Sequence, residues 1–367
     1  MEPGAELTEE LRRIGLASGL AAVGVTAARP WSHTRGILES RRAVGLAGGM
    51  AFTYRNPARS SDPSRILARA ASLVVGAWPY AQQTPDRPVG LSARVARYAT
   101  DDHYGDMERA LGHIATRLRE DGHRALVMSD DNSLVDREAA WRAGIGFTGK
   151  NANVLLPGRG SWFVLGSVVT DAVLPNTTPP VAEQCGSCRR CLDGCPTGAI
   201  ISSGTVDAGR CLAWLLQRPG TFPHEFRVAL GDRIYGCDDC QEVCPPSRRE
   251  EAGTGRVAGP DAWLDVLDLL DLDDERLLDR CDRWYIPGRD PNVIRRNLLV
   301  IVGNSGREAG RPVLVRYAAD GDPILSEHAT WALARLDELA ASGSPASRPA
   351  TVVRLERDRP AQQTSNQ

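Results

Sequence analysis

Eight of the nine cysteines in this 367-residue chain lie in two short runs, and this arrangement constrains the fold more than any other feature. The runs are Cys185-x2-Cys188-x2-Cys191-x3-Cys195-Pro196 and Cys211 followed by Cys237-x2-Cys240-x3-Cys244-Pro245. Closely spaced thiolates on a tight loop can hold three corners of one iron–sulfur cubane, whereas a cysteine one turn further on points away. The sequence therefore predicts a segment folded around two [4Fe-4S] clusters.

The cysteine before each proline is predicted to bind the other cluster, as in bacterial two-cluster ferredoxins. One ligand set is then Cys185, Cys188, Cys191 and Cys244. The other is Cys195, Cys211, Cys237 and Cys240, in which Cys211 completes the count. Cys281 is left over in an apolar stretch and is expected to be a buried core thiol.

Zinc and disulfides fit this pattern less well. Structural zinc uses paired C-x2-C knuckles or cysteine with histidine, but the first run has three cysteines in succession and no histidine. Disulfide frameworks belong to short secreted chains, and this chain is long enough for two or three domains. Iron is therefore the favoured metal, with zinc as the alternative.

Charge and hydropathy limit the possible partners. A formal charge of -2 argues against a protein that coats nucleic acid indiscriminately, although local basic patches are compatible with it. The pair Arg12-Arg13 resembles a twin-arginine export signal, but the region is acidic and its apolar run is interrupted, so we expect an amphipathic helix instead. No stretch approaches the roughly 20 apolar residues of a membrane span. We expect a cytoplasmic protein without membrane association.

Lys150 is the one lysine among the 44 basic residues. It lies in the glycine-rich turn 144–151 (GIGFTGKN), where the backbone can approach a ligand closely. The turn is not a P-loop, because Asn151 stands where a hydroxyl residue is required. Either this position needs an ammonium group and not a guanidinium, or the lysine is a chance survivor of an arginine-rich composition.

The hydrophobic periodicity predicts two kinds of architecture. Up to residue 178 helices and strands alternate, which indicates an α+β domain: helices are expected at 7–18 and 106–121, and strands at 21–26, 72–77, 125–129 and 161–169. After Pro260 the pattern is helical, typical of a helical-repeat unit, with segments at 263–270, 274–283, 293–302, 312–319 and 325–340. The tail 341–367 is expected to be disordered.

Between residues 289 and 316 six arginines face only two acidic residues. Such a face is the expected footprint of a phosphate backbone. An ordinary solvated helix face is the alternative. Arg295 and Arg296 are the residues predicted to contact RNA.

The cysteine runs with their flanks, residues 185–200 and 231–245, resemble the epoxyqueuosine reductase family. The resemblance spans roughly residues 7–340, and it includes 97–98, 130–137, 143–151, 160–163 and 328–335. Two-cluster cysteine patterns occur in many iron–sulfur proteins, so the specificity lies in the combination.

The resemblance implies a cytoplasmic cobalamin enzyme that reduces the epoxide of epoxyqueuosine in tRNA, the last step of queuosine synthesis. It implies a nitroreductase-like cobalamin-binding α+β domain (1–178), a ferredoxin-like two-cluster domain (179–255) and an all-α, HEAT-like helical-repeat domain that holds the anticodon arm (256–340). Electrons would come from a donor protein or another reductant. We expect a monomer.

The resemblance also implies a mechanism, in which cob(I)alamin fed by the clusters acts at carbon and an acid protonates the epoxide oxygen. Asp130 matches the proton donor of the family, and an apolar pocket would raise the pKa of its carboxyl. Asp131 stays an alternative, because the Asp-Ser-Ala-Pro of the family is replaced by Asp-Asp-Asn-Ser at 130–133. Asp130 could also be only a helix N-cap.

Arg97, Asp130, Cys237 and Asp238 are nominated as cobalamin contacts by the same resemblance, with Lys150 and Ser161 near the expected border of the corrin. Arg97 and Asp238 could instead form an ion pair at the surface or between domains. Two other functions remain open. A reductive-dehalogenase-like enzyme shares the cofactors, and an electron-transfer protein without an activity of its own shares the clusters.

Overall fold

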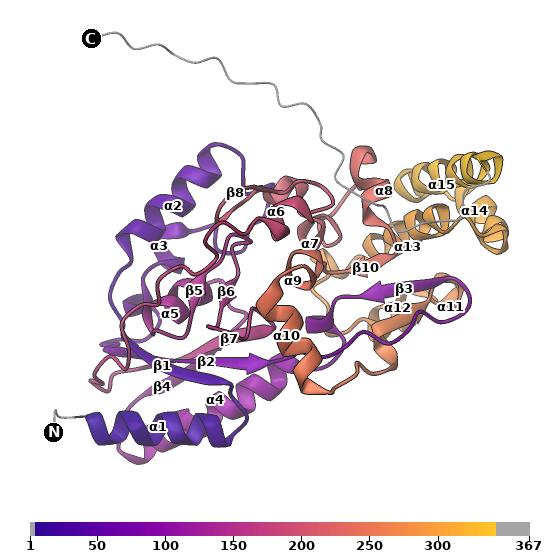
Figure 1. Cartoon of the computed structure of the whole chain (residues 1–367). Coiled ribbons are helices and arrows are strands. Elements are labelled where there is room, and N and C mark those ends of the chain that lie inside the picture. Colours follow the sequence, from indigo (N-terminus) through magenta and orange to yellow (C-terminus); the bar gives the residue numbers. More distant parts are fainter. Residues whose placement is uncertain (1–3, 343–367) are drawn as a thin grey trace, which may run out of the picture.

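A computed structural model describes residues 4–342 of the chain (Figure 1). Its N-terminal part is built on an antiparallel sheet of four strands in the order β1-β2-β7-β4. The strands are β1 (Ala22–Ala27), β2 (Ser72–Pro79), β7 (Phe163–Thr170) and β4 (Ala125–Ser129). All four confirm strands that the apolar runs predict, to within two residues at each end.

Helices cover both faces of this sheet (Figure 1). On one face α1 (Ala5–Ala17) and α4 (His103–Glu120) pack against Val74. On the other face α5 (Asp136–Arg142) packs against Leu73 and Val75. Because both faces are buried, β2 is a continuous apolar run without alternation.

Shorter elements connect the sheet and its helices. They are α2 (Ser32–Ala43), α3 (Pro57–Ser60), the strands β5 (Phe147–Thr148) and β6 (Val154–Leu155), and the 3-10 turns η1 (Pro63–Arg65) and η2 (Arg97–Ala99). The strands β5 and β6 pair as a small hairpin, and the lysine-containing turn joins them.

β3 (Ser92–Val95) pairs outside this sheet, with strands from much later in the chain. It runs parallel to β10 (Arg233–Tyr235) and antiparallel to β11 (Trp263–Asp265). The helix predicted over 263–270 is therefore wrong at its start, because β3 offers these residues an edge to pair with, and α11 (Val266–Asp271) begins only afterwards. The apolar residues of β3 also join the C-terminal core, across the expected boundary after residue 178.

The cysteine segment contains only short elements, which carry the thiols on turns. They are α6 (Arg190–Asp193), β8 (Ile200–Ser202), β9 (Thr205–Val206), η3 (Ala208–Arg210), α7 (Leu212–Leu215), η4 (His224–Phe226), α8 (Arg227–Leu230), α9 (Asp239–Glu242) and α10 (Pro245–Thr254). Cys244 is the N-cap of α10, and Pro245 occupies the first position of that helix, where a proline is tolerated.

The C-terminal part is helical. It contains η5 (Pro260–Ala262), α12 (Asp274–Arg280), η6 (Pro287–Arg289), α13 (Asn292–Ser305), η7 (Glu308–Gly310), α14 (Arg311–Ala318) and α15 (Pro323–Ser342). Gly303 allows α13 and α15 to approach closely, since a Cβ at that position would lie 2.8 Å from Cα of Ala332. The predicted disordered tail lies outside the described residues from 343 onward. None of the helices within residues 4–342 is long and apolar enough to cross a membrane.

Candidate cluster sites and active site

The structure brings the first predicted set of thiols together. Desolvation raises the pKa of Cys191 to about 11, and the neighbouring thiols of Cys185, Cys244 and Cys188 also affect it. All nine cysteines are free thiols in the described part of the chain. Burial opposes the thiolate form, and bound iron would supply the positive charge that stabilises it.

The second predicted set also converges. Desolvation raises the pKa of Cys240 well above its usual value, and the thiols of Cys237, Cys211 and Cys195 add to the rise, as does Cys191 of the first set. The backbone N–H of Ala199 donates to Sγ of Cys195 at 3.2 Å. Within residues 4–342 no three His, Cys, Asp or Glu side chains converge as they would around a single metal ion. The donors available in this segment are soft thiols, the chemistry that [4Fe-4S] clusters require.

The two sets differ in their surroundings. Gly186, Ser187, Arg189 and Arg190, which lie between the cysteines of the first run, are exposed. In contrast, Cys195 of the second set is buried. The first set is therefore closer to solvent, and the second lies deeper in the protein.

Asp130 directly follows β4 and has a positive φ of 47°, a conformation that aspartate tolerates better than most residues. Its side chain is exposed to solvent, but the surrounding protein desolvates the carboxylate. This desolvation, with a smaller contribution from Asp131, raises the pKa of Asp130 to about 6.

The helix-capping alternative for Asp130 is wrong for the helix that follows it. That helix, α5, begins at Asp136 and has Val135 as its N-cap. Asp131 is the residue engaged in the local turn, because its Oδ1 accepts a hydrogen bond from the backbone N–H of Ser133 at 2.6 Å. The side chain of Asp130 is therefore not engaged in capping α5.

Asp130 affects the ionisation of a tyrosine that belongs to an aromatic cluster. Desolvation raises the pKa of Tyr235 to about 12, and the charge of Asp130 adds to the rise. The ring of Tyr235 lies 6.1 Å from that of Tyr98 and stacks on Trp284 at 4.5 Å. Tyr235 precedes Cys237 by two residues, so the strand β10 connects the surroundings of Asp130 with the deeper thiol set.

A second carboxyl, Asp136, was not predicted as part of this site. Desolvation raises its pKa well above the usual value, and Asp130 adds to the effect. Desolvation also raises the pKa of the half-buried Tyr104, and the charges of Asp130 and Asp136 add to the rise. No periodicity or motif distinguishes Asp136 in the sequence, because burial depends on the folded structure.

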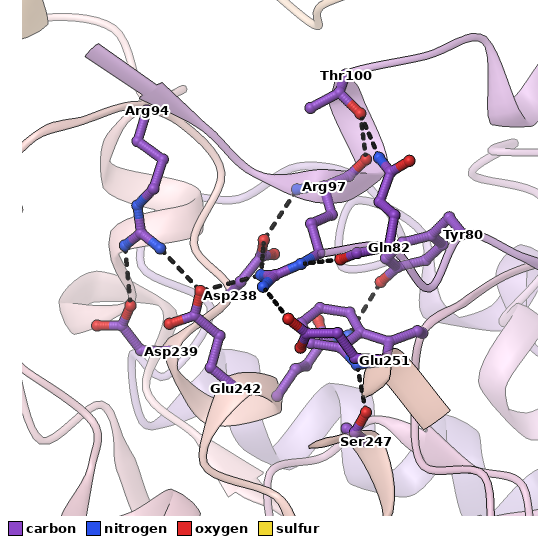
Figure 2. Close-up of polar contacts among 12 residues, drawn as sticks. Tyr80, Gln82, Arg94, Arg97, Thr100, Asp238, Asp239, Glu242, Ser247 and Glu251 are labelled. Atoms are coloured by element: carbon purple, nitrogen blue, oxygen red, sulfur yellow. Dashed lines mark hydrogen bonds and ion pairs between the residues drawn. The ribbon is translucent and has the colours of Figure 1, made fainter. Parts of the chain in front are cut away.

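Arg97 and Asp238 belong to a buried ion-pair network (Figure 2). The guanidinium of Arg97 donates to Oδ2 of Asp238 at 3.2 Å, to Glu242 at 2.9 Å and to Glu251 at 3.0 Å, and it lies 4.6 Å from the ring centre of Trp162. Nε donates to the backbone oxygen of Gln82. Arg97 and Asp238 therefore form an ion pair between distant parts of the chain, which was the alternative to a cobalamin contact.

Two polar atoms near this network have no hydrogen-bond partner among the described residues, Oδ1 of Asp238 and Oγ of Ser161. Buried polar atoms are normally paired, so these two atoms are available to a bound group. Desolvation raises the pKa of Asp238, although Arg97 opposes the rise. Desolvation also acts against the charged form of Glu242, but Arg94 and Arg97 overcome it and lower its pKa.

Lys150 contacts the cysteine segment. Its ammonium donates to the backbone oxygen of Gly186 and, at 3.0 Å, to that of Cys188. Gly186 lies between two predicted ligands of the first set, and Cys188 is one of them. Lys150 thus contacts the first cysteine run, and its place at the border of the corrin stays a prediction.

Arg295 and Arg296 correct the predicted RNA contact. Arg295 is 8% exposed and pairs with Asp274 at 2.5 Å, and Arg296 is 1% exposed and donates to the backbone oxygens of Gly220 and Leu215. Both guanidiniums bind protein and are not available to a phosphate. Cys281 is 1% exposed in the C-terminal core, which confirms its prediction as a buried thiol.

A separate cavity of about 470 Å³ is lined by Thr26, Trp141, Arg142 and residues 176–180. None of the predicted site residues lines it. The thiol sets and Asp130, and not this cavity, therefore define the candidate site.

The fold and the thiol sets define an iron–sulfur protein in which a two-cluster segment is packed against an α+β part. Residues 184–247 match the family model of a 4Fe-4S double cluster binding domain. The chain is 32% identical over 344 residues to the epoxyqueuosine reductase of Xanthomonas campestris pv. campestris, a match that covers 89% of this chain and 95% of the relative. The Lactococcus garvieae enzyme of the same name is 29% identical, with 90% and 96% covered.

Solved structures agree along nearly the whole chain. An epoxyqueuosine reductase with a tRNA-Tyr epoxyqueuosine-modified tRNA stem loop superposes with a TM-score of 0.82 at 28% identity, covering 92% of each chain. The Bacillus subtilis enzyme, with its catalytic aspartate loop swung out of the active site, gives 0.82 at 27% identity, with 92% of each chain covered. The chain belongs to the epoxyqueuosine reductase family, whose members are oxidoreductases.

Proposed function

We propose that this protein reduces the epoxide of epoxyqueuosine in tRNA to the cyclopentene of queuosine. The observation that carries the proposal is Asp130, a solvent-accessible carboxyl whose pKa is raised to about 6. It influences the ionisation of Tyr235, which leads to the deeper thiol set through Cys237. The proposed proton donor therefore lies near the proposed route of the electrons. The chain is also related along its length to epoxyqueuosine reductases.

The reaction requires both a supply of protons and a supply of electrons. Conversion of an epoxide to an alkene and water consumes two electrons and two protons, and the iron–sulfur clusters pass electrons singly. An alkoxide is a poor leaving group, so Asp130 in its acid form would donate a proton to the epoxide oxygen. The clusters only relay electrons, so the proposal includes an external donor.

The ligand sets are part of the proposal. One cluster would be held by Cys185, Cys188, Cys191 and Cys244, and the other by Cys195, Cys211, Cys237 and Cys240. Three of the four thiols that affect the ionisation of Cys240 belong to its own set, and the three that affect Cys191 all belong to the first set, which supports this division.

Cobalamin completes the proposal. The unpartnered atoms of Asp238 and Ser161 and the partly desolvated carboxyl of Asp130 suit a large polar cofactor, although Arg97 would act through Asp238 and not by direct contact. When bound, cobalamin supplies a strong reductant that acts at carbon. Asp130 would hold the proton beside it, and Tyr98 and Tyr235 would exclude bulk water.

The finer architecture is proposed as well. A nitroreductase-like part would be followed by a ferredoxin-like two-cluster part and a HEAT-like helical part that helps to hold the anticodon arm of tRNA. The covered sheet, the short cysteine-bearing turns and the packed pairs α13–α15 and α14–α15 support this division. We further propose a cytoplasmic monomer, since a reducing compartment keeps thiols available for iron.

The test is direct. Protein shown to contain both clusters and cobalamin is incubated with tRNA carrying epoxyqueuosine and a low-potential reductant, and the nucleosides are analysed by mass spectrometry. We expect the modified nucleoside to lose one oxygen atom. Unchanged epoxyqueuosine with fully loaded protein would disprove the proposal, and cluster absorption without bound corrin would favour an electron-transfer protein.

A further inference from the structure

The turn between β5 and β6 lies against both thiol sets, although it belongs to the α+β part of the chain. Lys150 donates to the backbone oxygens of Gly186 and Cys188 in the first run. The side-chain amide of Asn153 lies 4.0 Å from Sγ of Cys240 in the second. The backbone oxygen of Lys150 accepts from the N–H of Gly204, beyond the first run. One turn therefore contacts the surroundings of both proposed clusters.

The contact of Lys150 suits an ammonium group. The two carbonyl acceptors lie two residues apart in the turn that carries Cys185 and Cys188, and Gly186 has a positive φ of 51° there. An ammonium on a flexible stem can place separate donors on two such oxygens, whereas a planar guanidinium is larger and holds its donors in a fixed fork. This requirement explains why the single lysine of the chain occurs at this position.

The charge of Lys150 is not neutralised locally. No carboxylate forms an ion pair with it among the described residues, and its side chain is only half-exposed, so solvent screens the charge less than at an open surface. A cluster becomes more negative by one charge when it accepts an electron. A fixed positive charge beside its ligands therefore favours the reduced state.

We propose that Lys150 is the positioning residue of the first cluster: its ammonium holds the Cys185–Cys188 turn in the ligating conformation and raises the reduction potential of that cluster. The first set is the one closer to solvent, so the residue would favour entry of electrons from outside. This inference rests on the proposed ligand sets and not on the identity of the substrate.

The experiment compares Lys150→Met, which removes the charge and the donors, with Lys150→Arg, which keeps the charge. Each protein is loaded with iron and titrated with reductant while the reduced clusters are followed by electron paramagnetic resonance, without tRNA. We expect Lys150→Met to decrease the reduced-to-oxidised ratio of one cluster by roughly tenfold at a fixed potential, which is about 59 mV for one electron. The other cluster should be unchanged.

Arg189→Gln is the matched control. It removes a charge beside Cys188 from an exposed side chain that pairs with Asp193 and does not hold the turn, so the shift should be much smaller. Lys150→Arg should keep most of the potential but lose iron from the first cluster faster to a chelator.

Two results would overturn the inference. The first is Lys150→Met with both clusters present and both potentials unchanged. The second is equal loss of both clusters in Lys150→Met and Lys150→Arg together with lost secondary structure, which would make Lys150 a general folding residue. If Lys150→Met loses the first cluster alone, the positioning role is supported, and the potential of Lys150→Arg then measures the effect of charge. The proposed epoxide reduction can fail without affecting any of these readouts.

Discussion

The guanidinium of Arg97 donates a hydrogen bond to Oδ2 of Asp238 at 3.2 Å, and both side chains are only 4% exposed. The backbone N–H of Arg97 donates to the same oxygen at 2.8 Å. Asp238 directly follows Cys237, so this pair joins the turn after β3 to the segment that carries the deeper thiol set (Figure 2).

Replacing Arg97 by methionine should destabilise the protein strongly. The change leaves Asp238 and two glutamates without their shared partner, and breaking a buried pair in this way costs about 3–5 kcal/mol. We expect a clearly lower midpoint of thermal unfolding, measured by circular dichroism on cluster-loaded protein. Arg12→Met is the control, because its pair with Glu9 is exposed and such pairs contribute little to stability. Similar midpoints for the two variants would contradict a structural role for the network.

Activity should depend on the acid form of Asp130. Its pKa lies at about 6, so the protonated fraction is nearly complete below that pH and falls about tenfold per unit well above it. Single-turnover rates measured from pH 5 to 9 with saturating reductant should decrease in the same way. Asp130→Asn should abolish this dependence together with most of the activity.

Asp131→Asn distinguishes the two candidate proton donors. It should retain activity with an apparent pKa below that of the parent, because a like charge beside Asp130 has been removed. The opposite pattern, with Asp130→Asn active and Asp131→Asn inactive, would transfer the role to Asp131.

The stability of the folded protein should also depend on pH through the carboxyl of Asp130. Because the folded-state pKa of Asp130 is raised, the folded protein binds the proton more tightly than the unfolded chain does, and the stabilising effect is lost as pH rises through about 6. Asp130→Asn should therefore raise the unfolding midpoint relative to the parent at pH 8 and have less effect at pH 4.5. An identical difference at both pH values would show that the carboxylate is not desolvated in the folded protein.

Cysteine variants should distinguish the thiols that bind the clusters from the thiol in the C-terminal core. Cys211→Ser removes a proposed ligand of the deeper cluster, so the iron content should fall from about eight atoms towards four per chain. Cys281→Ala removes a thiol in the C-terminal core and should keep all the iron. Iron and sulfide analysis after reconstitution gives the result. A full iron content in Cys211→Ser would show that another residue completes the second set.

Arg296 should contribute to stability and not to RNA binding. Desolvation lowers the pKa of this guanidinium to about 10, and its hydrogen bonds go to backbone oxygens of residues 215 and 220. Arg296→Gln should lower the unfolding midpoint, while the folded fraction binds tRNA with unchanged affinity. The exposed Arg307 is a suitable comparison, since its charge can be removed without disturbing the core. A selective loss of tRNA affinity in Arg296→Gln would restore the original prediction.

Local patterns were sufficient where the physical cause is local. The strand Ala125–Ser129 was predicted at its observed bounds, because a short apolar run between polar turns favours a strand even at the edge of a sheet, where only Met128 of this strand is buried. Trp263–Asp265 was predicted as helix and is strand, because its partner is Ser92–Val95, far away in the sequence. Strand pairing of this kind leaves no periodic signal in either segment.

The sequence by itself determined the thiol chemistry, because turn geometry depends on spacing within a few residues, and the division of the thiols into two ligand sets stays a prediction. Only the tertiary structure decided the roles of the charged residues. Arg97, Lys150, Arg295 and Arg296 carry the same sign of charge, and their partners lie from about 20 to more than 150 residues away. A long side chain can reach solvent, a carboxylate or a backbone oxygen, and the choice depends on what the fold places beside it.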